Sequence, residues 1–541
     1  MQPPKRARVE KSSSAECQGM ICSGRRNVFT LNKSKHRGCE FAFSDILLLL
    51  FRRLRTVDTH GCSIPKITSQ PLSSNRWLPK APRQGDSGTM SIQDGQGKGT
   101  LDVAHYFDDE GIPAKIPYGG TSSRNHLAFK YYDEDQIVRG KSMREWLRFS
   151  VCYWHTMRGV GLDPFGGGTI SRPWEDGTDG LENAKRRLRV AFEFMKRLGV
   201  PFWTFHDRDI APEGATLAES GKLLDAVVDL AVELQSSTGI SCLWGTANLF
   251  STRRYMNGAS TNPDAHVFAY AAAQVKKVME VTHRLGGQNL VFWGGREGYQ
   301  SLLNTDVRQE LDHMAAFFRM VVAYKAKIGA TYQLLLEPKP KEPTAHQYDY
   351  DAQTVICFLK TYGLDKDFKI NIEPNHTTLA GHCAEHDVVM ASKFGMLGSI
   401  DANTGVAHLG WDTDCFMADP QQTTLIMKTV LEQGGIAPGG LNFDAKVRRE
   451  STALEDMFIA HIQGMDAFAK GLVGAAALLE EGLLPRMVAA RYASYAEGFG
   501  KRLAEGQASL EECEAFVAEH GEPRLVSGSQ EKFQSIFNTY A

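Results

Sequence analysis

The chain has 541 residues, of which 42% are hydrophobic and 23% are charged, and its formal net charge is −2. This composition is typical of a globular enzyme and gives no general attraction to nucleic acid or to an anionic membrane. No apolar run approaches the roughly 20 residues that a membrane-spanning helix needs, so we expect neither nucleic acid nor a membrane as a partner.

The first hundred residues differ from the rest of the chain. Residues 1–89 contain 16 Lys and Arg against 6 Asp and Glu, whereas residues 90–541 contain 45 against 57. Because residues 1–100 are also rich in Ser, Gly and Pro and lack periodicity, we expect a mostly disordered basic leader. Three interpretations of it are open: a nuclear import signal at residues 4–9, an organelle transit peptide, or an incorrectly assigned start with Met90 as the initiator.

From about Ala104 onward, short apolar runs alternate with amphipathic stretches such as Leu181–Leu198 and Ala265–Leu285. Eight runs each end in a polar or charged cluster: Arg148–Thr156, Pro201–Asp209, Ile240–Asn248, Asn289–Gly298, Thr331–Lys339, Phe368–His376, Met396–Asn403 and Gly440–Lys446. Near-continuous apolar strands that alternate with helices indicate a parallel sheet, and eight such units predict an α/β fold of the (β/α)8 TIM barrel type over residues 101–472. The alternative is a doubly wound open sheet, which would gather its functional groups near one switch point.

The chain after the eighth strand falls outside this repeat. We expect one more helix over Ser451–Leu472, followed by helical segments broken by Gly over residues 473–541. This C-terminal helical arm is predicted to pack on a neighbouring subunit. The ten cysteines include no Cys-x-x-Cys pair, which favours free thiols in a reducing, cytoplasmic compartment unless the leader redirects the chain.

Acidic residues and one histidine follow the last four predicted strands. They are Glu337, Glu373, His376, Asp401, Asp412, Asp414 and Asp444, with Lys339 and Asn371 beside them. In a barrel these strand ends meet at one mouth, where active sites form. Six carboxylates so close together would repel one another, and several would have to protonate unless cations neutralised them.

Two divalent cations would resolve this repulsion. The acids carry −6, two metal ions would supply +4 and Lys339 supplies +1. Oxygen ligands with a single imidazole suit Mg²⁺, Mn²⁺ or Co²⁺, and the lack of cysteine at these positions argues against a structural zinc site.

Other strand ends carry groups suited to proton transfer and to binding a sugar. His206 and Asp209 follow the second strand, and a carboxylate near an imidazole can fix its tautomer and raise its basicity. The same residues could instead form a salt-bridged structural turn. Trp154, Phe250 and Trp293 suggest an apolar wall around the mouth, although each could simply pack in the core.

Together these motifs resemble those of xylose isomerase, in the longer class of that family. The resemblance covers about Ala104 to the C-terminus, and the leader has no counterpart in it. The matching motifs are His206-Asp207-x-Asp209, Trp293-Gly-Gly-Arg-Glu-Gly298, Glu337-Pro-Lys339-Pro, Asn371-Ile-Glu373-x-Asn-His376, Gly410-Trp-Asp412-Thr-Asp414 and Asn442-Phe-Asp444-Ala-Lys446.

The resemblance implies an intramolecular oxidoreductase that interconverts D-xylose and D-xylulose, and also D-glucose and D-fructose, by ring opening and a metal-assisted 1,2-hydride shift. Two metal ions, Mg²⁺ first and Mn²⁺ or Co²⁺ as alternatives, would share Glu373. The first ion would bind Glu337, Glu373, Asp401 and Asp444, and the second would bind Glu373, His376, Asp412 and Asp414.

The resemblance also implies roles for residues that bind no metal. His206, oriented by Asp209, would assist ring opening, and Lys339 would hydrogen-bond the substrate O1. Phe165 would reach into a neighbour's active site, which implies at least a dimer and, by family habit, a homotetramer. The residues implied to line the substrate pocket are Trp154, Thr246, Phe250, Trp293 and Phe165.

Two rival functions make different demands on the sequence. A metal-dependent phosphodiesterase on the same barrel, such as an apurinic-site endonuclease, would need more histidine ligands and a basic face. A binding protein that had lost activity would have at least one broken ligand position, whereas all seven are intact. The residues alone do not decide between xylose, glucose and related aldoses.

Overall fold

A computed structural model of the chain describes residues 102–541, and these belong to one compact unit. The predicted leader lies outside the described residues, as do residues 4–9 and Met90. The description below therefore concerns the barrel and the segments that follow it.

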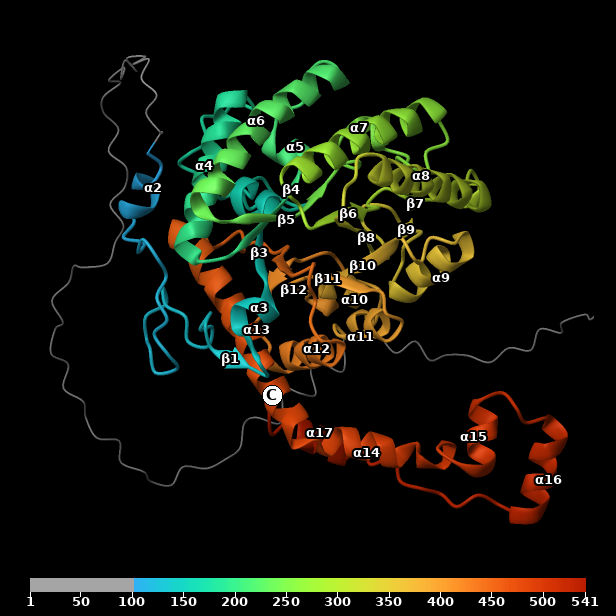
Figure 1. The fold of residues 1–541 in the computed structure, drawn as a ribbon. Coiled ribbons are helices and arrows are strands. Elements are labelled where there is room, and N and C mark those ends of the chain that lie inside the picture. The colour runs from blue at the N-terminus through green and yellow to red at the C-terminus, as the bar shows by residue number, and fades with distance from the viewer. Residues whose placement is uncertain (1–101) are drawn as a thin grey trace, which may run out of the picture. The chain divides into compact units, whose positions relative to one another are not determined.

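The predicted barrel is confirmed, and the open-sheet alternative is wrong. Eight parallel strands close on themselves in the order β10-β11-β14-β3-β4-β5-β6-β8 (Figure 1). Each lies within one of the eight predicted apolar runs: β3 (Phe149–Cys152), β4 (Phe202–His206), β5 (Ser241–Thr246), β6 (Asn289–Trp293), β8 (Gln333–Glu337), β10 (Phe368–Ile372), β11 (Leu397–Asp401) and β14 (Leu441–Phe443).

Helices surround the barrel (Figure 1), and several begin at an aspartate. Asp264, Asp306, Asp351 and Asp419 each accept a backbone N–H of the first helical turn, which satisfies a donor that the helix leaves unpaired. The outer helices are α4 (Leu181–Leu198), α6 (Leu217–Thr238), α7 (Ala265–Arg284), α8 (Val307–Lys327), α9 (Ala352–Tyr362), α10 (Pro374–Leu379), α11 (His386–Lys393) and α12 (Pro420–Gln433).

Short elements decorate the barrel and its loops. The helices among them are α2 (His105–Asp108), α3 (Met143–Leu147) and α5 (Asp207–Ile210), and the antiparallel pairs are β1 (Ile137–Val138) with β2 (Lys141–Ser142), β7 (Gly298–Tyr299) with β9 (His346–Gln347), and β12 (Asn403–Thr404) with β13 (Cys415–Phe416). Inside the barrel, Leu243, Trp244, Val291 and Leu335 form a buried apolar cluster. The barrel is therefore a packed core with its polar groups above this layer.

The helix after the eighth strand is longer than predicted. Helix α13 runs from Leu454 to Glu481, so the predicted end at Leu472 is wrong. The glycines in this part of the helix do not end it but lie where neighbouring segments approach closely. A Cβ on Gly471 would lie 2.5 Å from Thr423 Oγ1, and one on Gly474 would lie 2.3 Å from the carbonyl oxygen of Tyr540. A side chain at either position would push α13 away from its neighbours.

Helix α13 is long and apolar enough to be considered a membrane span by length and composition. However, 72% of its most apolar stretch is buried inside the fold. Its buried residues include Phe458, Met465 and Phe468, which belong to the main hydrophobic core. This is the burial of a core helix.

The chain beyond α13 forms the predicted helical arm. The arm contains α14 (Leu483–Arg491), α15 (Gly498–Ala504), α16 (Leu510–His520) and α17 (Gln530–Phe537). Phe537 of α17 is buried in a small apolar cluster with Leu478 and Leu484, which ties the end of the arm to α13. Helices α15 and α16 contact each other through the stacked rings of Phe499 and Phe516.

Candidate metal centre at the barrel mouth

The structure brings all seven predicted metal ligands to the carboxyl-terminal mouth of the barrel. Glu337 and Asp401 are the last residues of β8 and β11, and Glu373 follows β10 directly. Three groups have ligand atoms within 4.8 Å of one another: Glu337, Glu373 and His376; Glu373, Asp401 and Asp444; and Glu373, Asp412 and Asp414. Glu373 belongs to all three groups, as a carboxylate shared between two cations must.

The crowding of the acids has the electrostatic consequence expected from the sequence. Burial and the charges of Asp401 and Asp444 raise the pKa of Glu337 well above its usual value. Burial, followed by Asp412 and Asp444, does the same to Glu373, and burial with Asp444 raises the pKa of Asp401. These carboxylates resist ionisation in the protein alone, and divalent cations would stabilise their charged forms.

Basic groups offset the negative charge of Asp412 and Asp414 on the other side of the mouth. Lys339 Nζ lies 2.5 Å from Asp412 Oδ2, and Lys446 Nζ lies 2.8 Å from Asp414 Oδ2. Although burial alone would raise it, Lys446 and the hydrogen bond from His155 hold the pKa of Asp414 well below its usual value. The pKa values are therefore raised near Glu337 and Asp401 and lowered at Asp414.

The sequence interpretation missed His155. Its Nε2 lies 3.2 Å from Asp414 Oδ2 and 3.1 Å from Asp444 Oδ1. Burial lowers its pKa, but hydrogen bonds to the two carboxylates outweigh this and raise the pKa to about 9. His155 lies at the end of the first predicted strand next to Trp154, so its strand-end position was the signal that could have identified it.

A layer of asparagines supports the ligands from below. Asn371 Nδ2 donates to both Glu337 Oε2 (2.9 Å) and Asp401 Oδ2 (2.6 Å). Asn442 donates to Asp401 Oδ1 (2.7 Å), and its own Oδ1 accepts from Ser150 and Thr204. All of these groups are buried, so the ligand carboxylates are held in fixed orientations by satisfied hydrogen bonds.

Asn403 and Asn375 hold the Glu373 side of the mouth. Asn403 Nδ2 donates to Glu373 Oε1 (2.7 Å), and Asn375 Nδ2 donates to both Asp412 and Asp414. The hydrogen-bonding role of this asparagine layer was not predicted, although Asn371, Asn375 and Asn442 belong to the matching motifs.

The predicted pair of His206 and Asp209 is also formed. His206 Nδ1 lies 2.7 Å from Asp209 Oδ2, which leaves Nε2 as the proton-accepting nitrogen of the neutral ring. The indole of Trp154 stacks on this ring at 4.1 Å between centroids, and Trp154 Nε1 donates to Asp444 Oδ1 (2.9 Å). The imidazole is thereby fixed at the wall of the mouth.

A pocket lies beside the ligands and has an aromatic wall. Phe250 and Trp293 meet edge to face at 4.4 Å between ring centroids, and the ammonium of Lys339 lies 5.0 Å from the Trp293 centroid. The pocket is lined by four of the five predicted substrate residues, Trp154, Thr246, Phe250 and Trp293, together with Trp244, Val291 and the charged groups of the mouth. The pocket has one apolar wall and one polar wall. This suits a sugar, because its C–H face is apolar and its hydroxyl groups are polar.

Phe165 is the predicted substrate residue that does not line this pocket. Its side chain is 81% exposed and lies 5.9 Å from the ring of Trp411, at the outer opening of the mouth.

The chain is similar to proteins named xylose isomerase over most of its length. It is 57% identical over 425 residues to a protein named xylose isomerase from Arabidopsis thaliana, and 53% identical to one from Hordeum vulgare, covering 79% of this chain and 89% of each relative. It is 54% identical to a xylose isomerase from Rhodopirellula baltica, of which it covers 97%. Residues 488–541 match the model of the XylA2 C-terminal domain.

Proposed function

The chain belongs to the xylose isomerase family, and from this premise we infer that it is an aldose–ketose isomerase that interconverts D-xylose and D-xylulose. Six acids and one histidine converge at the barrel mouth, and Glu373 belongs to every group that they form. This observation supports placing the reaction at the mouth. D-glucose and D-fructose, which differ from the pentoses by one hydroxymethyl group, are proposed as further substrates.

The donor set of the mouth fits two divalent cations. The pKa values of Glu337, Glu373 and Asp401 are raised by burial and by neighbouring acids, so the site favours added positive charge. Oxygen donors with one imidazole suit hard ions, and we propose Mg²⁺, with Mn²⁺ or Co²⁺ as substitutes. When bound, these ions supply Lewis-acid polarisation of the oxygens of the open-chain sugar.

The side chains of the pocket supply the remaining steps. The ring of His206 is oriented by Asp209. It accepts the proton of O1 from the cyclic sugar and returns a proton to the ring oxygen, which opens the ring. The Lys339 ammonium donates a hydrogen bond to O1 as negative charge grows there. The O2 proton is released, hydride moves from C2 to C1, and O1 takes up a proton, so that C2 becomes the carbonyl and C1 the alcohol. The aromatic wall of Trp154, Phe250 and Trp293 shields this transfer from water.

Removal and return of metal tests the proposed activity. Protein stripped with a chelator is expected to form no xylulose from D-xylose, and added Mg²⁺, Mn²⁺ or Co²⁺ is expected to restore turnover. Ketose formation is measured by a coupled reduction of xylulose. Turnover that persists in fully stripped protein would contradict the metal assignment, and no xylulose with any of the three ions would contradict the isomerase.

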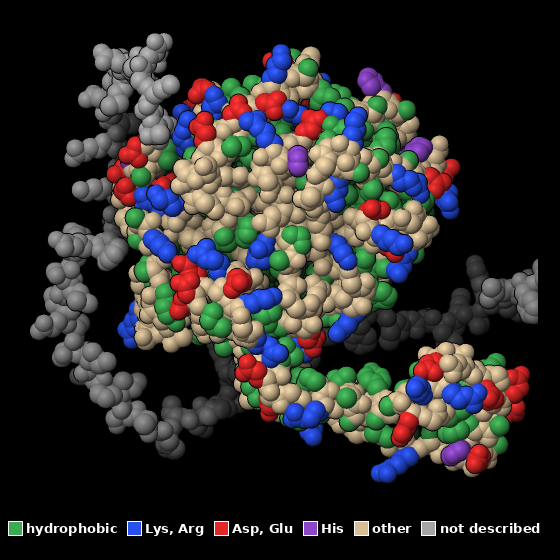
Figure 2. All heavy atoms as spheres, viewed as in Figure 1, with side chains coloured by type: hydrophobic (Ala, Val, Ile, Leu, Met, Phe, Trp, Pro, Cys, Tyr) green, Lys and Arg blue, Asp and Glu red, His purple; other side chains and the backbone are tan. Residues whose placement is uncertain are grey.

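We propose that the active protein is a homotetramer in which residues 473–541 pack on a neighbouring subunit. Leu510, Val517, Leu525 and Val526 of the arm are each more than half exposed, and apolar side chains gather on the arm in Figure 2. Exposed apolar surface of this kind is typical of an interface. Phe165, also exposed, is proposed to complete a partner's pocket.

Charges placed on the arm test this assembly. The double variant Leu510→Glu, Val517→Glu is expected to shift the sedimenting species from tetramer to smaller forms, because burying two carboxylates in an apolar interface is unfavourable. Gln507→Glu, on the same exposed segment, is the control that adds charge without removing apolar surface. An unchanged sedimentation coefficient for the double variant would exclude the arm from the interface.

We further propose a cytoplasmic location for the enzyme. The cysteines of residues 102–541 are all free of disulfides, and Cys152 and Cys242 are buried. Unpaired thiols favour a reducing compartment.

A further inference from the structure

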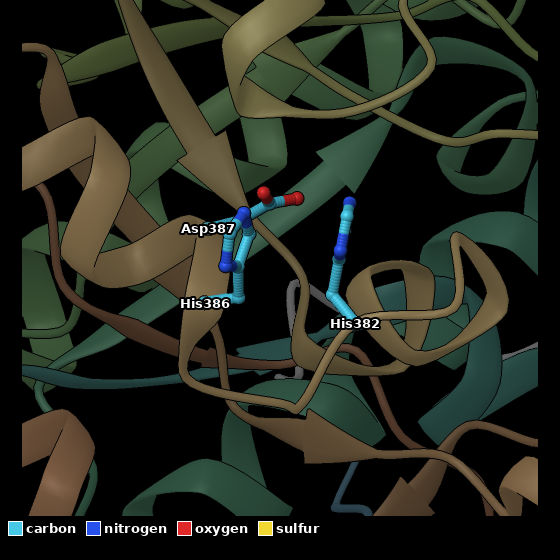
Figure 3. Close-up of side chains that lie close together, drawn as sticks. All are labelled: His382, His386 and Asp387. Atoms are coloured by element: carbon cyan, nitrogen blue, oxygen red, sulfur yellow. The ribbon is translucent and has the colours of Figure 1, made fainter.

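A second group of metal-ligating side chains lies away from the barrel mouth. His382, His386 and Asp387 come from the loop after α10 and from the first turn of α11 (Figure 3). None of them lines the pocket or contacts the acids described above. Their role is therefore not explained by the isomerase reaction.

The three side chains are arranged as ligands of a single ion. One nitrogen of each histidine and one oxygen of Asp387 all lie within 4.8 Å of one another. Two atoms bound to one zinc ion at about 2.1 Å can be at most about 4.2 Å apart, so small side-chain rotations bring the group into coordination distance. The rings of His382 and His386 lie nearly parallel, at 4.2 Å between centroids.

Asp351 supplies a further carboxylate beside His382. Asp351 Oδ2 lies 3.2 Å from His382 Nε2, while its Oδ1 caps helix α9 by accepting from Thr354. Two imidazoles and two carboxylates make up a ligand set typical of tetrahedral zinc. The charges of Asp351 and Asp387 would balance that of the ion.

Buried polar atoms of the cluster have no partner within the described residues. Asp387 is 2% exposed, and although its Oδ2 accepts a hydrogen bond from Thr377, its Oδ1 has none. His386 Nε2 is likewise buried and unpaired. A buried atom without a partner costs free energy, and a bound ion would relieve that cost at this cluster.

We propose that His382, His386 and Asp387, with Asp351 as the fourth ligand, bind a divalent ion of the zinc class. This ion joins the start of α9, the loop after α10 and the start of α11. Helix α10 carries His376, and Glu373 is its N-cap, so the proposed site lies one loop away from the helix that presents two ligands of the barrel mouth. The inference is independent of the proposed reaction.

The selectivities of the two sites should differ. The barrel mouth has six carboxylates and one imidazole among its ligands, whereas the second cluster has two imidazoles and two carboxylates. Nitrogen donors favour zinc and tetrahedral cobalt, and oxygen-rich sites favour octahedral magnesium or manganese. Excess Mg²⁺ should therefore fill the mouth and leave the second cluster to zinc.

Metal analysis of the full-length protein tests the proposal. Wild-type protein dialysed against Zn²⁺ with excess Mg²⁺ is expected to retain one more zinc ion per chain than the double variant His382→Ala, His386→Ala. Cobalt in place of zinc should give the strong visible absorption of a tetrahedral site, and this absorption should be absent from the double variant. His126→Ala, an exposed histidine elsewhere, is the matched control and should retain the ion.

Two further variants separate this site from the barrel mouth. Glu373→Gln should lose metal from the mouth and keep the cobalt absorption, and the double variant should keep wild-type turnover with Mg²⁺. If the double variant does not fold, His382→Gln should weaken zinc binding at least about tenfold, since even loss of a group that only supports a ligand costs about that much. Equal zinc content in the wild type and the folded histidine variants would overturn the proposal.

Discussion

Glu373→Gln is expected to lower turnover of D-xylose by at least about 10³-fold. Glu373 is the residue common to all three ligand groups at the barrel mouth, and it is 2% exposed. The amide is nearly the same size but carries no charge, so both proposed cations lose a shared anionic ligand. Lewis-acid stabilisation is worth several kcal/mol, which corresponds to about three orders of magnitude in rate.

Two measurements on this variant separate loss of metal from loss of fold. Isothermal titration with Mn²⁺ should show weakened binding at the mouth, while circular dichroism stays that of the wild type. Glu233→Gln, on the exposed face of α6, is the matched control and should behave as wild type. Turnover within tenfold of the wild type for Glu373→Gln would show that this carboxylate does not bridge two catalytic ions.

Lys339→Met is expected to reduce kcat by about 10² to 10³-fold, the loss measured when one donor that stabilises a developing oxyanion is removed. Lys339 is 4% exposed, and Asp412 together with Asp414 and Glu373 raises the pKa of its ammonium despite burial. The group therefore stays charged across the working pH range. Methionine keeps much of the apolar stem and removes the charge, which lies 5.0 Å from the centroid of the Trp293 ring.

The split between kcat and KM decides the interpretation of this variant. Lys339 is proposed to act on O1 as its charge develops, so kcat should fall much more than KM rises. Metal titration is the second readout, since Asp412 loses its ion-pair partner and its affinity for a cation should not decrease. Lys360→Met, on the exposed side of α9, is the control. Unchanged kcat for Lys339→Met would exclude a role in the chemical step.

Much of the site could be predicted because a parallel barrel has a simple geometry. Each apolar run that ends in acids must place those acids at the carboxyl end of its strand, and all such ends meet at one mouth. Glu337, Glu373 and Asp401 could therefore be grouped before any coordinates were known. The pairing of His206 with Asp209 was predictable for a similar reason, since both residues lie in one short segment.

Other contacts depend on how distant segments pack, and local sequence carries little signal for them. His155 reaches Asp414 and Asp444 across the mouth. Its strand-end position could have placed it at the mouth, but the sequence does not show which two carboxylates it contacts. The end of α13 was misjudged because the segments after Leu472 were expected to be broken by Gly, whereas the lack of a side chain at Gly474 permits close packing on the carbonyl oxygen of Tyr540. Both features exist only once the barrel is closed.

The cluster of His382, His386 and Asp387 also separates what the sequence determines from what the tertiary structure determines. The sequence alone determined the eight-fold repeat, the family and the seven candidate ligands that meet at the barrel mouth, because period and motif are properties of neighbouring residues. The tertiary structure decided which polar atoms are buried without partners, which bases face which acids, and that Asp351 comes within 3.2 Å of His382. Burial and long-range electrostatics depend on the distances between segments, and only the folded chain sets those distances.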